Sequence, residues 1–119
     1  MKAYLLIISV LFLIACGAKK NISSTPEPVA VASFTEGDIA RASAKFPGTT
    51  ATHLNRGKAL YEGHCGACHK LKAVGEYTEE QWREINPNMV KQANTYKGAN
   101  IDADAELAIL KYLITMAKL

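Results

Sequence analysis

Five consecutive residues, Cys65-Gly66-Ala67-Cys68-His69, constrain this chain more than any other feature. The spacing C-x-x-C-H is that of a covalent haem attachment site, because it lets two sulfurs meet one porphyrin edge within a single helical turn. The histidine that follows is carried under the iron, where its imidazole can be the proximal ligand. The motif therefore predicts one haem c bonded to Cys65 and Cys68, with His69 on the iron.

The same motif has three other interpretations: a disulfide, a thioredoxin-like redox pair, and half of a zinc site. A zinc site needs another Cys or His pair at finger spacing, and none follows His69. A redox C-x-x-C usually lies within a βαβ pattern, and the sequence shows no such pattern. Covalent haem is favoured over all three, because the N-terminal leader directs the chain to a compartment where haem is attached.

Residues 1–15 have the pattern of a signal peptide, with Lys2 followed by the apolar run 5–14. That run is too short for a comfortable transmembrane helix. It ends in Leu-Ile-Ala-Cys, which resembles the lipobox of bacterial lipoproteins, whose cysteine becomes the lipidated first residue. An ordinary signal with a chance cysteine would leave a spare thiol exposed in an oxidising compartment. We therefore predict lipid attachment at Cys16 and a membrane-anchored protein that faces the periplasm or cell exterior.

Cysteine count and charge restrict the remaining possibilities. One of the three cysteines takes the lipid and two take the haem, which leaves none for a structural disulfide. Removing Lys2 with the leader leaves 13 basic and 11 acidic residues, a net +2, and two haem propionates bring the protein near neutrality. No basic run appears, so nucleic-acid binding is not expected. A chain of 119 residues supports one domain, whose marginal core a buried haem would complete, and we expect a monomer.

Polarity and helical spacing divide the rest of the chain. Residues 16–33 are rich in polar residues and proline and predict a flexible tether, and residues 34–119 predict the folded domain. No alternating strand pattern appears, so the domain is expected to be all-α. The predicted helices begin at caps and run from Thr35 to Pro47, from about His53 (capped by Thr52) to Cys65, from Thr78 onwards, and from Asp102 to the end.

Two positions in these helices carry specific expectations. Gly57 lies within an apolar face, where the cost of a helical glycine indicates that another backbone approaches closely. Pro87 falls inside the third helix and predicts a kink or break near Met89. The polar segment 91–101, which includes Gly98, is expected to be a loop.

The chain resembles class I cytochromes c, specifically small bacterial single-haem lipoproteins, over residues 46–119. The family places a glycine-x-x-x-aromatic pattern in its N-terminal helix and an aliphatic-x-x-aromatic-aliphatic pattern in its C-terminal helix. This resemblance implies a bundle of about four helices around one covalent haem, in which those two helices cross at the glycine. The residues that carry it are Cys65, Cys68 and His69, then Gly57 and Tyr61, then Ile109, Tyr112 and Leu113.

The chain departs from that family at two places. Many members have a proline after the motif, whose carbonyl accepts a hydrogen bond from Nδ1 of the ligand histidine, and residues 70–75 contain none. A carbonyl within 71–75 is expected to do this instead, because a ligand histidine needs its second nitrogen oriented. Met89 lies only 20 positions after His69. The distal side is therefore expected to come from the helix over 78–89 and the loop after it.

Four residues are candidates for the sixth iron ligand: Met89, Met116, His53 and His64. Met116 continues the packing face of the last helix, and His64 directly precedes Cys65 and cannot reach the opposite side of the ring. The resemblance implies a methionine after such a helix, which favours Met89. A core methionine, another of the four candidates, or an open position remain the alternatives.

These observations predict a carrier that shuttles electrons between periplasmic or membrane redox partners, without enzymatic activity of its own. Tyr61, Trp82 and Tyr112 are expected to wall the haem pocket, although aromatics at helical spacing are also ordinary core residues. The alternatives are a haem-based gas or redox sensor with an open distal position, and a C-x-x-C thiol oxidoreductase. Three lysines near the motif either steer an acidic partner or form a solvated face: Lys58, Lys70 and Lys72.

Overall fold

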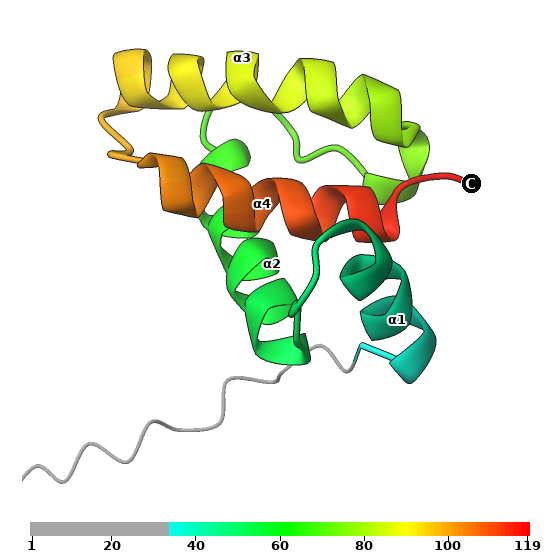
Figure 1. Ribbon diagram of the computed structural model, residues 1–119. Helices are drawn as coiled ribbons and strands as arrows, with labels where there is room; N and C mark the ends of the chain where they lie inside the picture. Colours follow the sequence, from blue (N-terminus) through cyan, green and yellow to red (C-terminus); the bar gives the residue numbers. More distant parts are fainter. Residues whose placement is uncertain (1–33) are drawn as a thin grey trace, which may run out of the picture.

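The computed structural model describes residues 34–119, which fold into a small helical domain (Figure 1). The predicted signal peptide, the tether and Cys16 lie outside the described residues. Within the described range, the only β pairing outside the helices is a single bridge between Thr78 and Lys118, so the all-α prediction is confirmed. The elements are α1 (Glu36–Lys45), α2 (Ala51–Cys65), the 3₁₀ helix η1 (Val74–Glu76), α3 (Glu79–Lys97) and α4 (Ala103–Met116).

Side-chain caps begin the α-helices, because the first backbone N–H groups of a helix have no partner within it. Thr35 and Thr78 open α1 and α3 with capping boxes, and Asp102 accepts from the Ala105 N–H at 2.8 Å before α4. These three starts are confirmed. The start of α2 was predicted two residues late, since Thr50 rather than Thr52 is the cap.

The helix α3 corrects two expectations. It is one span from Glu79 to Lys97 that continues through Pro87, so no break occurs there and residues 91–97 are not loop. Pro87 lacks an N–H and leaves the carbonyl of Arg83 without a helical partner, but Arg83 is exposed and water can satisfy that oxygen. The helix ends only at Gly98, whose φ of 60° is the left-handed conformation that favours glycine.

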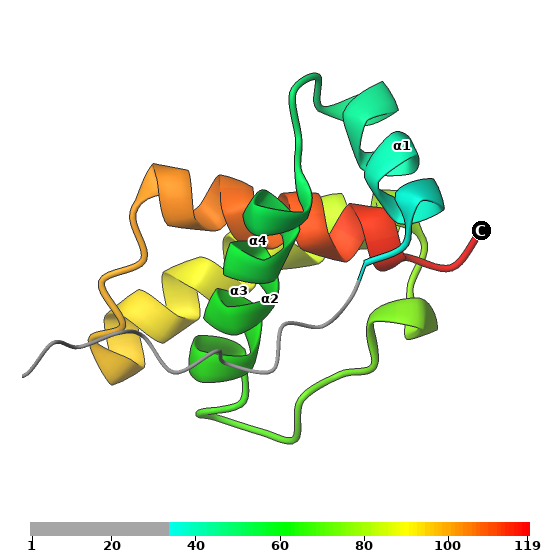
Figure 2. The same cartoon turned by 90° about the horizontal axis from the view of Figure 1, so that it is seen from below.

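The helices α2 and α4 cross at Gly57, and both views show α2 lying across α4 (Figures 1 and 2). A Cβ atom on Gly57 would collide with the carbonyl oxygen of Ala108 and lie 2.8 Å from Cβ of Tyr112. The expected close backbone approach at Gly57 is therefore confirmed. Leu54, one turn before Gly57, and Ile109 on α4 are both 0 % exposed, so this crossing forms one side of the core.

The helix α1 packs against the C-terminal half of α4 (Figure 1). Nη2 of Arg41 donates to the carbonyl oxygen of Thr115 at 3.4 Å. The ring of Phe46, just after α1, has the cationic groups of Arg83 and Lys111 each 5.9 Å from its centroid. These contacts attach α1 to α3 and α4. Among residues 34–119, no helix has the length and hydropathy needed to cross a membrane.

Candidate haem site

The C-x-x-C-H motif lies where α2 ends, opposite the middle of α3. Cys65 is the last residue of α2, and Cys68 and His69 follow in the loop. A hollow lies between this motif and α3. Met89 and His69 both line it, although they are 20 positions apart in the sequence. The residues that line it are His64, Cys65, Cys68, His69, Met89, Gln92 and Ala93.

The imidazole of His69 is exposed and oriented by the backbone. Its Nδ1 lies 2.8 Å from the carbonyl oxygen of Lys70. A carbonyl oxygen only accepts, so the proton of this hydrogen bond is on Nδ1 and Nε2 keeps its lone pair for a metal. The acceptor expected within 71–75 is thus wrong by one residue, because the neighbouring peptide is within reach of the ring without any special loop geometry.

The two cysteines of the motif are free thiols in different surroundings. Cys65 is buried and Cys68 is exposed, and no disulfide joins them. Burial raises the pKa of the Cys65 thiol to about 11. A thiol oxidoreductase needs a thiolate stabilised at a lowered pKa, usually by a helix N-terminus or a cation. Cys65 lies instead at a helix C-terminus in apolar surroundings, which disfavours the thiol-redox interpretation.

Buried hydrogen-bond donors hold the loop that follows the motif. The Tyr61 hydroxyl donates to the carbonyl oxygen of Lys72 at 2.7 Å, and Trp82 Nε1 donates to that of Val74 at 2.9 Å. Burial raises the pKa of Tyr61 to about 12, so the phenol stays protonated and can donate. Near the chain end, the N–H of Lys118 donates to the carbonyl oxygen of Tyr77 at 2.9 Å. The loop is therefore fixed at three carbonyls before α3 begins.

The aromatic residues expected to wall the pocket lie together in the core. Tyr61, Trp82 and Tyr112 are all buried in the same cluster as Cys65. The ring centroid of Tyr61 is 6.1 Å from that of Trp82 and 6.0 Å from that of Tyr112. None of the three lines the hollow itself. Their contact with haem therefore stays a prediction.

Sequence reasoning missed two residues of the hollow, Gln92 and Ala93. They follow Met89 by three and four positions, so they share its face once the helix continues. The helical spacing of Trp82, Val90 and Ala93 on the buried side of α3 was the available signal. The polar composition of residues 91–97 favours a loop and hides this spacing, because most of these side chains are exposed.

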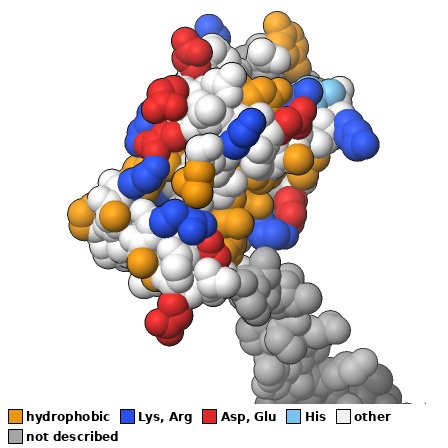
Figure 3. Space-filling view, turned by 90° about the vertical axis from the view of Figure 1, so that its right-hand side faces the viewer, with side chains coloured by type: hydrophobic (Ala, Val, Ile, Leu, Met, Phe, Trp, Pro, Cys, Tyr) orange, Lys and Arg blue, Asp and Glu red, His pale blue; other side chains and the backbone are white. Residues whose placement is uncertain are grey.

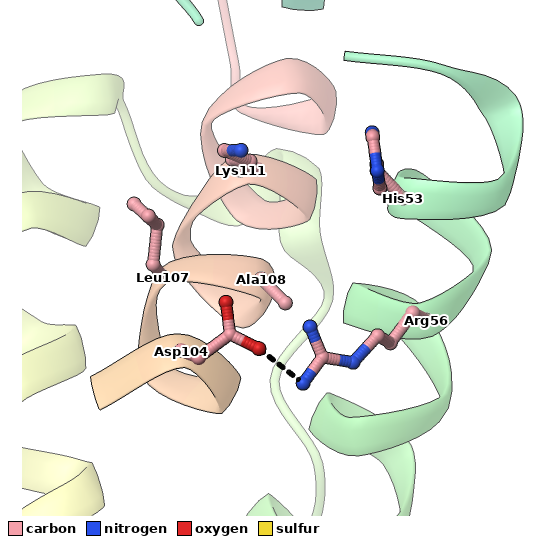
Figure 4. A pocket seen from close by; sticks show the side chains of 6 residues that line it. All are labelled: His53, Arg56, Asp104, Leu107, Ala108 and Lys111. Atoms are coloured by element: carbon pink, nitrogen blue, oxygen red, sulfur yellow. Dashed lines mark ion pairs between the residues drawn. The ribbon is translucent and has the colours of Figure 1, made fainter. Parts of the chain in front are cut away.

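Of the other ligand candidates, only His64 lines the hollow. Met116 is half-buried against the core near the end of α4. His53 lines a separate pocket between α2 and α4, where Arg56 and Asp104 form an ion pair at 2.7 Å (Figure 4). That pocket offers charged side chains and no cysteine, so it does not suit a covalently bound haem.

One buried polar side chain of α3, three positions before Met89, is unusual. Asn86 is 3 % exposed, and its Nδ2 has no hydrogen-bond partner among the described residues. The two other buried polar residues within 34–119, Thr49 and Thr115, donate to carbonyl oxygens. Leaving a buried donor unpaired costs about 1–3 kcal/mol. A bound group with a hydrogen-bond acceptor close to Asn86 Nδ2 would remove that cost.

The residues present fit a haem. Cys65 and Cys68 are unpaired thiols three residues apart, His69 presents an oriented imidazole, and the partly buried Met89 of α3 lines the same hollow. Within residues 34–119, no group of three or more Cys, His, Asp or Glu side chains is arranged to hold a metal ion.

The surface around the domain mixes both signs of charge. Figure 3 shows blue basic and red acidic side chains interspersed over one face. Among the lysines near the motif, Nζ of Lys58 donates to a Glu62 carboxylate oxygen at 2.5 Å, while Lys70 and Lys72 are exposed. The steering role proposed for these lysines therefore depends mainly on Lys70 and Lys72.

Comparison with known proteins identifies the family. The family model described as cytochrome c matches residues 54–116, more than half of the chain, from within α2 to the last residue of α4. No curated protein and no solved structure matches the chain. The matched region contains Cys65, Cys68 and His69 and excludes α1. The chain therefore belongs to the cytochrome c family, as an electron-transfer protein with covalently attached haem c.

Proposed function

We propose that this protein is a lipid-anchored, single-haem cytochrome c of class I that passes electrons between periplasmic or membrane redox partners. The proposal places the haem in the hollow between the C-x-x-C-H motif and α3, bonded to Cys65 and Cys68. The iron ligands are His69 and Met89. The observation that carries it is the position of Met89, which lines the same hollow as His69 although it comes from α3.

The haem, when bound, supplies one-electron cycling of its iron, and the chain supplies the surroundings. Lys70 orients His69 through its carbonyl oxygen, and the buried side of α3 keeps water from the distal position. The cytochrome c family consists generally of electron carriers rather than enzymes. We therefore propose a carrier, monomeric, with redox proteins as partners and without affinity for nucleic acid.

Geometry favours Met89 over the other candidate ligands. Met116 and His53 lie outside the hollow. His64 lines it but directly precedes Cys65, so it is held on the same side as the motif. Met89 comes from a different helix, which is what a ligand on the opposite side of a planar ring requires.

The ligand assignment is tested by replacing Met89 in the holoprotein. Met89→Ala should abolish the weak long-wavelength sulfur-to-iron band of the oxidised protein and let carbon monoxide bind the reduced protein quickly. Met89→His should keep the iron six-coordinate but lower the reduction potential, because Met/His ligation raises it. Met116→Leu is the matched control, a nearly volume-conserving swap that should leave the spectrum unchanged. Loss of the band in Met116→Leu and not in Met89→Ala would reverse the assignment.

The second candidate function is a haem-based gas or redox sensor with an open or weakly held distal position. The exposure of His69 and the small size of the hollow are the observations that favour it. The same spectra decide between the two functions. Rapid carbon monoxide binding by the unaltered reduced protein, with no sulfur band in the oxidised protein, would select the sensor.

The lipid anchor at Cys16 is tested by Cys16→Ser. A lipoprotein carries several acyl chains, more than the two signals that stable membrane attachment generally needs. The variant should be released as a soluble, still-red protein or remain unprocessed. Correctly cleaved Cys16→Ser protein that stays in the membrane fraction would contradict lipid attachment there.

A further inference from the structure

A second pocket lies between α2 and α4, away from the C-x-x-C-H motif. The residues that line it are His53 and Arg56 from α2, and Asp104, Leu107, Ala108 and Lys111 from α4 (Figure 4). His53 and Cys65 are 12 positions apart in α2, which is about 18 Å along a helix. The volume of the pocket is about 120 Å³. A small molecule can therefore bind there while the haem site is filled.

The helix crossing fixes the walls of this pocket. The backbone of Ala108 packs directly against Gly57, the residue that follows Arg56. Ala108 is 6 % exposed, whereas Leu107 is 42 % exposed and presents apolar surface to the pocket. A site whose backbone is already held in place loses little freedom when a ligand binds. The apolar wall suits a ligand that carries a short hydrocarbon chain.

The polar groups of the pocket favour a negatively charged ligand. Arg56 and Lys111 supply two positive charges against the one negative charge of Asp104, which gives a net charge of +1. The Thr50 N–H donates to Nδ1 of His53 at 3.2 Å, so the proton of the neutral ring is on Nε2, a further donor. The planar fork of an arginine guanidinium matches the two oxygens of a carboxylate.

The ion pair between Arg56 and Asp104 leaves the guanidinium accessible to a second anion. Nη2 of Arg56 lies 2.7 Å from Oδ2 of Asp104, and the two side chains are 48 % and 74 % exposed. Solvent screens so exposed a pair, which therefore contributes little to stability. A guanidinium has five N–H donors, and one carboxylate oxygen does not occupy them all. A carboxylate from outside the chain can thus join or replace that of Asp104.

We propose that this pocket binds the carboxylate of a small organic acid with a short apolar chain. Arg56 is the main anion-binding group, and Leu107 and Ala108 contact the chain of the ligand. Asp104 is an internal competitor, because its carboxylate occupies the same guanidinium. The proposal does not depend on which residues bind the haem iron.

The test titrates the holoprotein calorimetrically with butyrate, acetate and inorganic phosphate at constant ionic strength. Butyrate should bind more tightly than acetate, by up to about 4-fold for each additional CH₂ group that becomes buried. It should also bind more tightly than phosphate, which has no apolar part. Equal affinities for acetate and butyrate, or tighter binding of phosphate, would overturn the assignment of the ligand class.

Two substitutions should change butyrate affinity in opposite directions. Arg56→Gln removes the main anion-binding group and should lower the affinity by roughly 10-fold or more, the effect of losing a hydrogen bond between charged groups. Asp104→Asn removes the competitor and should raise the affinity by roughly 2- to 5-fold, the effect of releasing one exposed ion pair. Glu106→Gln is the matched control, because it makes the same charge change in α4 outside the pocket. That variant should leave the affinity unchanged.

A second measurement needs no variant. In nuclear magnetic resonance spectra of the reduced holoprotein, butyrate should shift the signals of the Arg56 side chain and the His53 ring. Shifts at His64 or Cys68 instead would place the anion at the haem motif and overturn the proposal. Unchanged butyrate affinity in Arg56→Gln would also overturn it. Equal effects of Asp104→Asn and Glu106→Gln would show that only the overall charge of the domain matters, and that Asp104 does not compete for the site.

Discussion

The α2–α4 crossing and the hollow beside α3 are built in opposite ways. At the crossing, Gly57 fits against the backbone of Ala108, and the residues around it are buried, none of them with a buried side-chain polar atom that lacks a partner. At the hollow, His69 is exposed, and one turn before Met89 in α3 the buried Asn86 has a donor without a partner among the described residues. The crossing is thus a scaffold that the chain completes by itself, whereas the hollow is the part of the molecule that we propose the haem completes.

The largest effect is expected from a substitution at the cysteines that attach the haem. Cys68→Ala removes one of the two attachment bonds and, because Cys68 is exposed, removes almost no packing. Most of the covalent holoprotein should be lost, and any remaining pigment should be held through Cys65 alone. Acid–acetone extraction measures this, since covalent haem stays with the polypeptide. Free extraction of haem from the unaltered protein would contradict covalent attachment. It would also remove the reason to regard the hollow, unlike the α2–α4 crossing, as a region that a bound group completes.

An intermediate effect is expected at the crossing itself. Gly57→Ala places a methyl group against the Ala108 carbonyl and should destabilise the holoprotein by about 1–3 kcal/mol, the usual cost of overpacking. Thermal unfolding should show a melting temperature lower by roughly 4–8 °C per kcal/mol for a domain of this size. The absorption spectrum should remain that of the unaltered protein, because the hollow is not involved.

Gly63→Ala is the matched control for Gly57→Ala. Both glycines lie in α2, but a Cβ at Gly63 has no atom within 4 Å. Alanine there should stabilise the protein by about 0.5–1 kcal/mol, because alanine loses less backbone freedom in a helix than glycine does. Equal changes in stability for the two substitutions would show that only helix propensity matters at Gly57. The close approach of α2 and α4 would then not explain the glycine.

The smallest effect concerns α1, which packs on α4 outside both regions. The Thr35 hydroxyl and N–H donate to Asp38 at 2.7 and 2.8 Å and hold the pKa of this carboxyl below its ordinary value. Because the pKa of Asp38 is lower in the folded state, its ionised carboxylate contributes to the stability of the fold. This contribution is fully present above the unfolded-state pKa of about 3.9 and is lost as the pH falls through the folded-state pKa.

Acidification should therefore loosen α1 before the haem site changes. The amide protection factors of residues 36–45, which are corrected for the intrinsic pH dependence of hydrogen exchange, should fall below about pH 4 while the absorption spectrum stays constant, and solvent screening keeps the effect small. Asp38→Asn should remove most of this pH dependence. Simultaneous loss of α1 protection and of the haem spectrum would show that α1 and the haem site unfold as one unit.

Much of the fold followed from short-range patterns. Thr35, Thr78 and Asp102 cap the helices they were expected to cap, because capping requires only a side-chain oxygen and an N–H within one turn. The error at Pro87 has a different origin. Whether a proline breaks a helix depends on whether the carbonyl oxygen that it leaves unpaired finds another hydrogen-bond donor. Here Arg83 is exposed, so water can donate to its carbonyl oxygen.

The candidate site was predictable to a smaller extent. The motif and Met89 were found from spacing and resemblance, and the family match supports the covalent haem. The acceptor of the His69 proton, the contribution of Gln92 and Ala93, and the isolation of Asn86 were not found. Each of these depends on how two segments face one another, and single-sequence periodicity carries no such information.

The sequence by itself determined the haem motif, the helical class and the glycine at the crossing, since each is encoded in residues within a turn or two of one another. Only the tertiary structure decided which side of α3 meets the motif, and that a buried amide stands beside Met89 without a partner among the described residues. The physical reason is that burial and hydrogen-bond satisfaction are properties of assembled segments. A side chain becomes paired or unpaired only when another element closes over it.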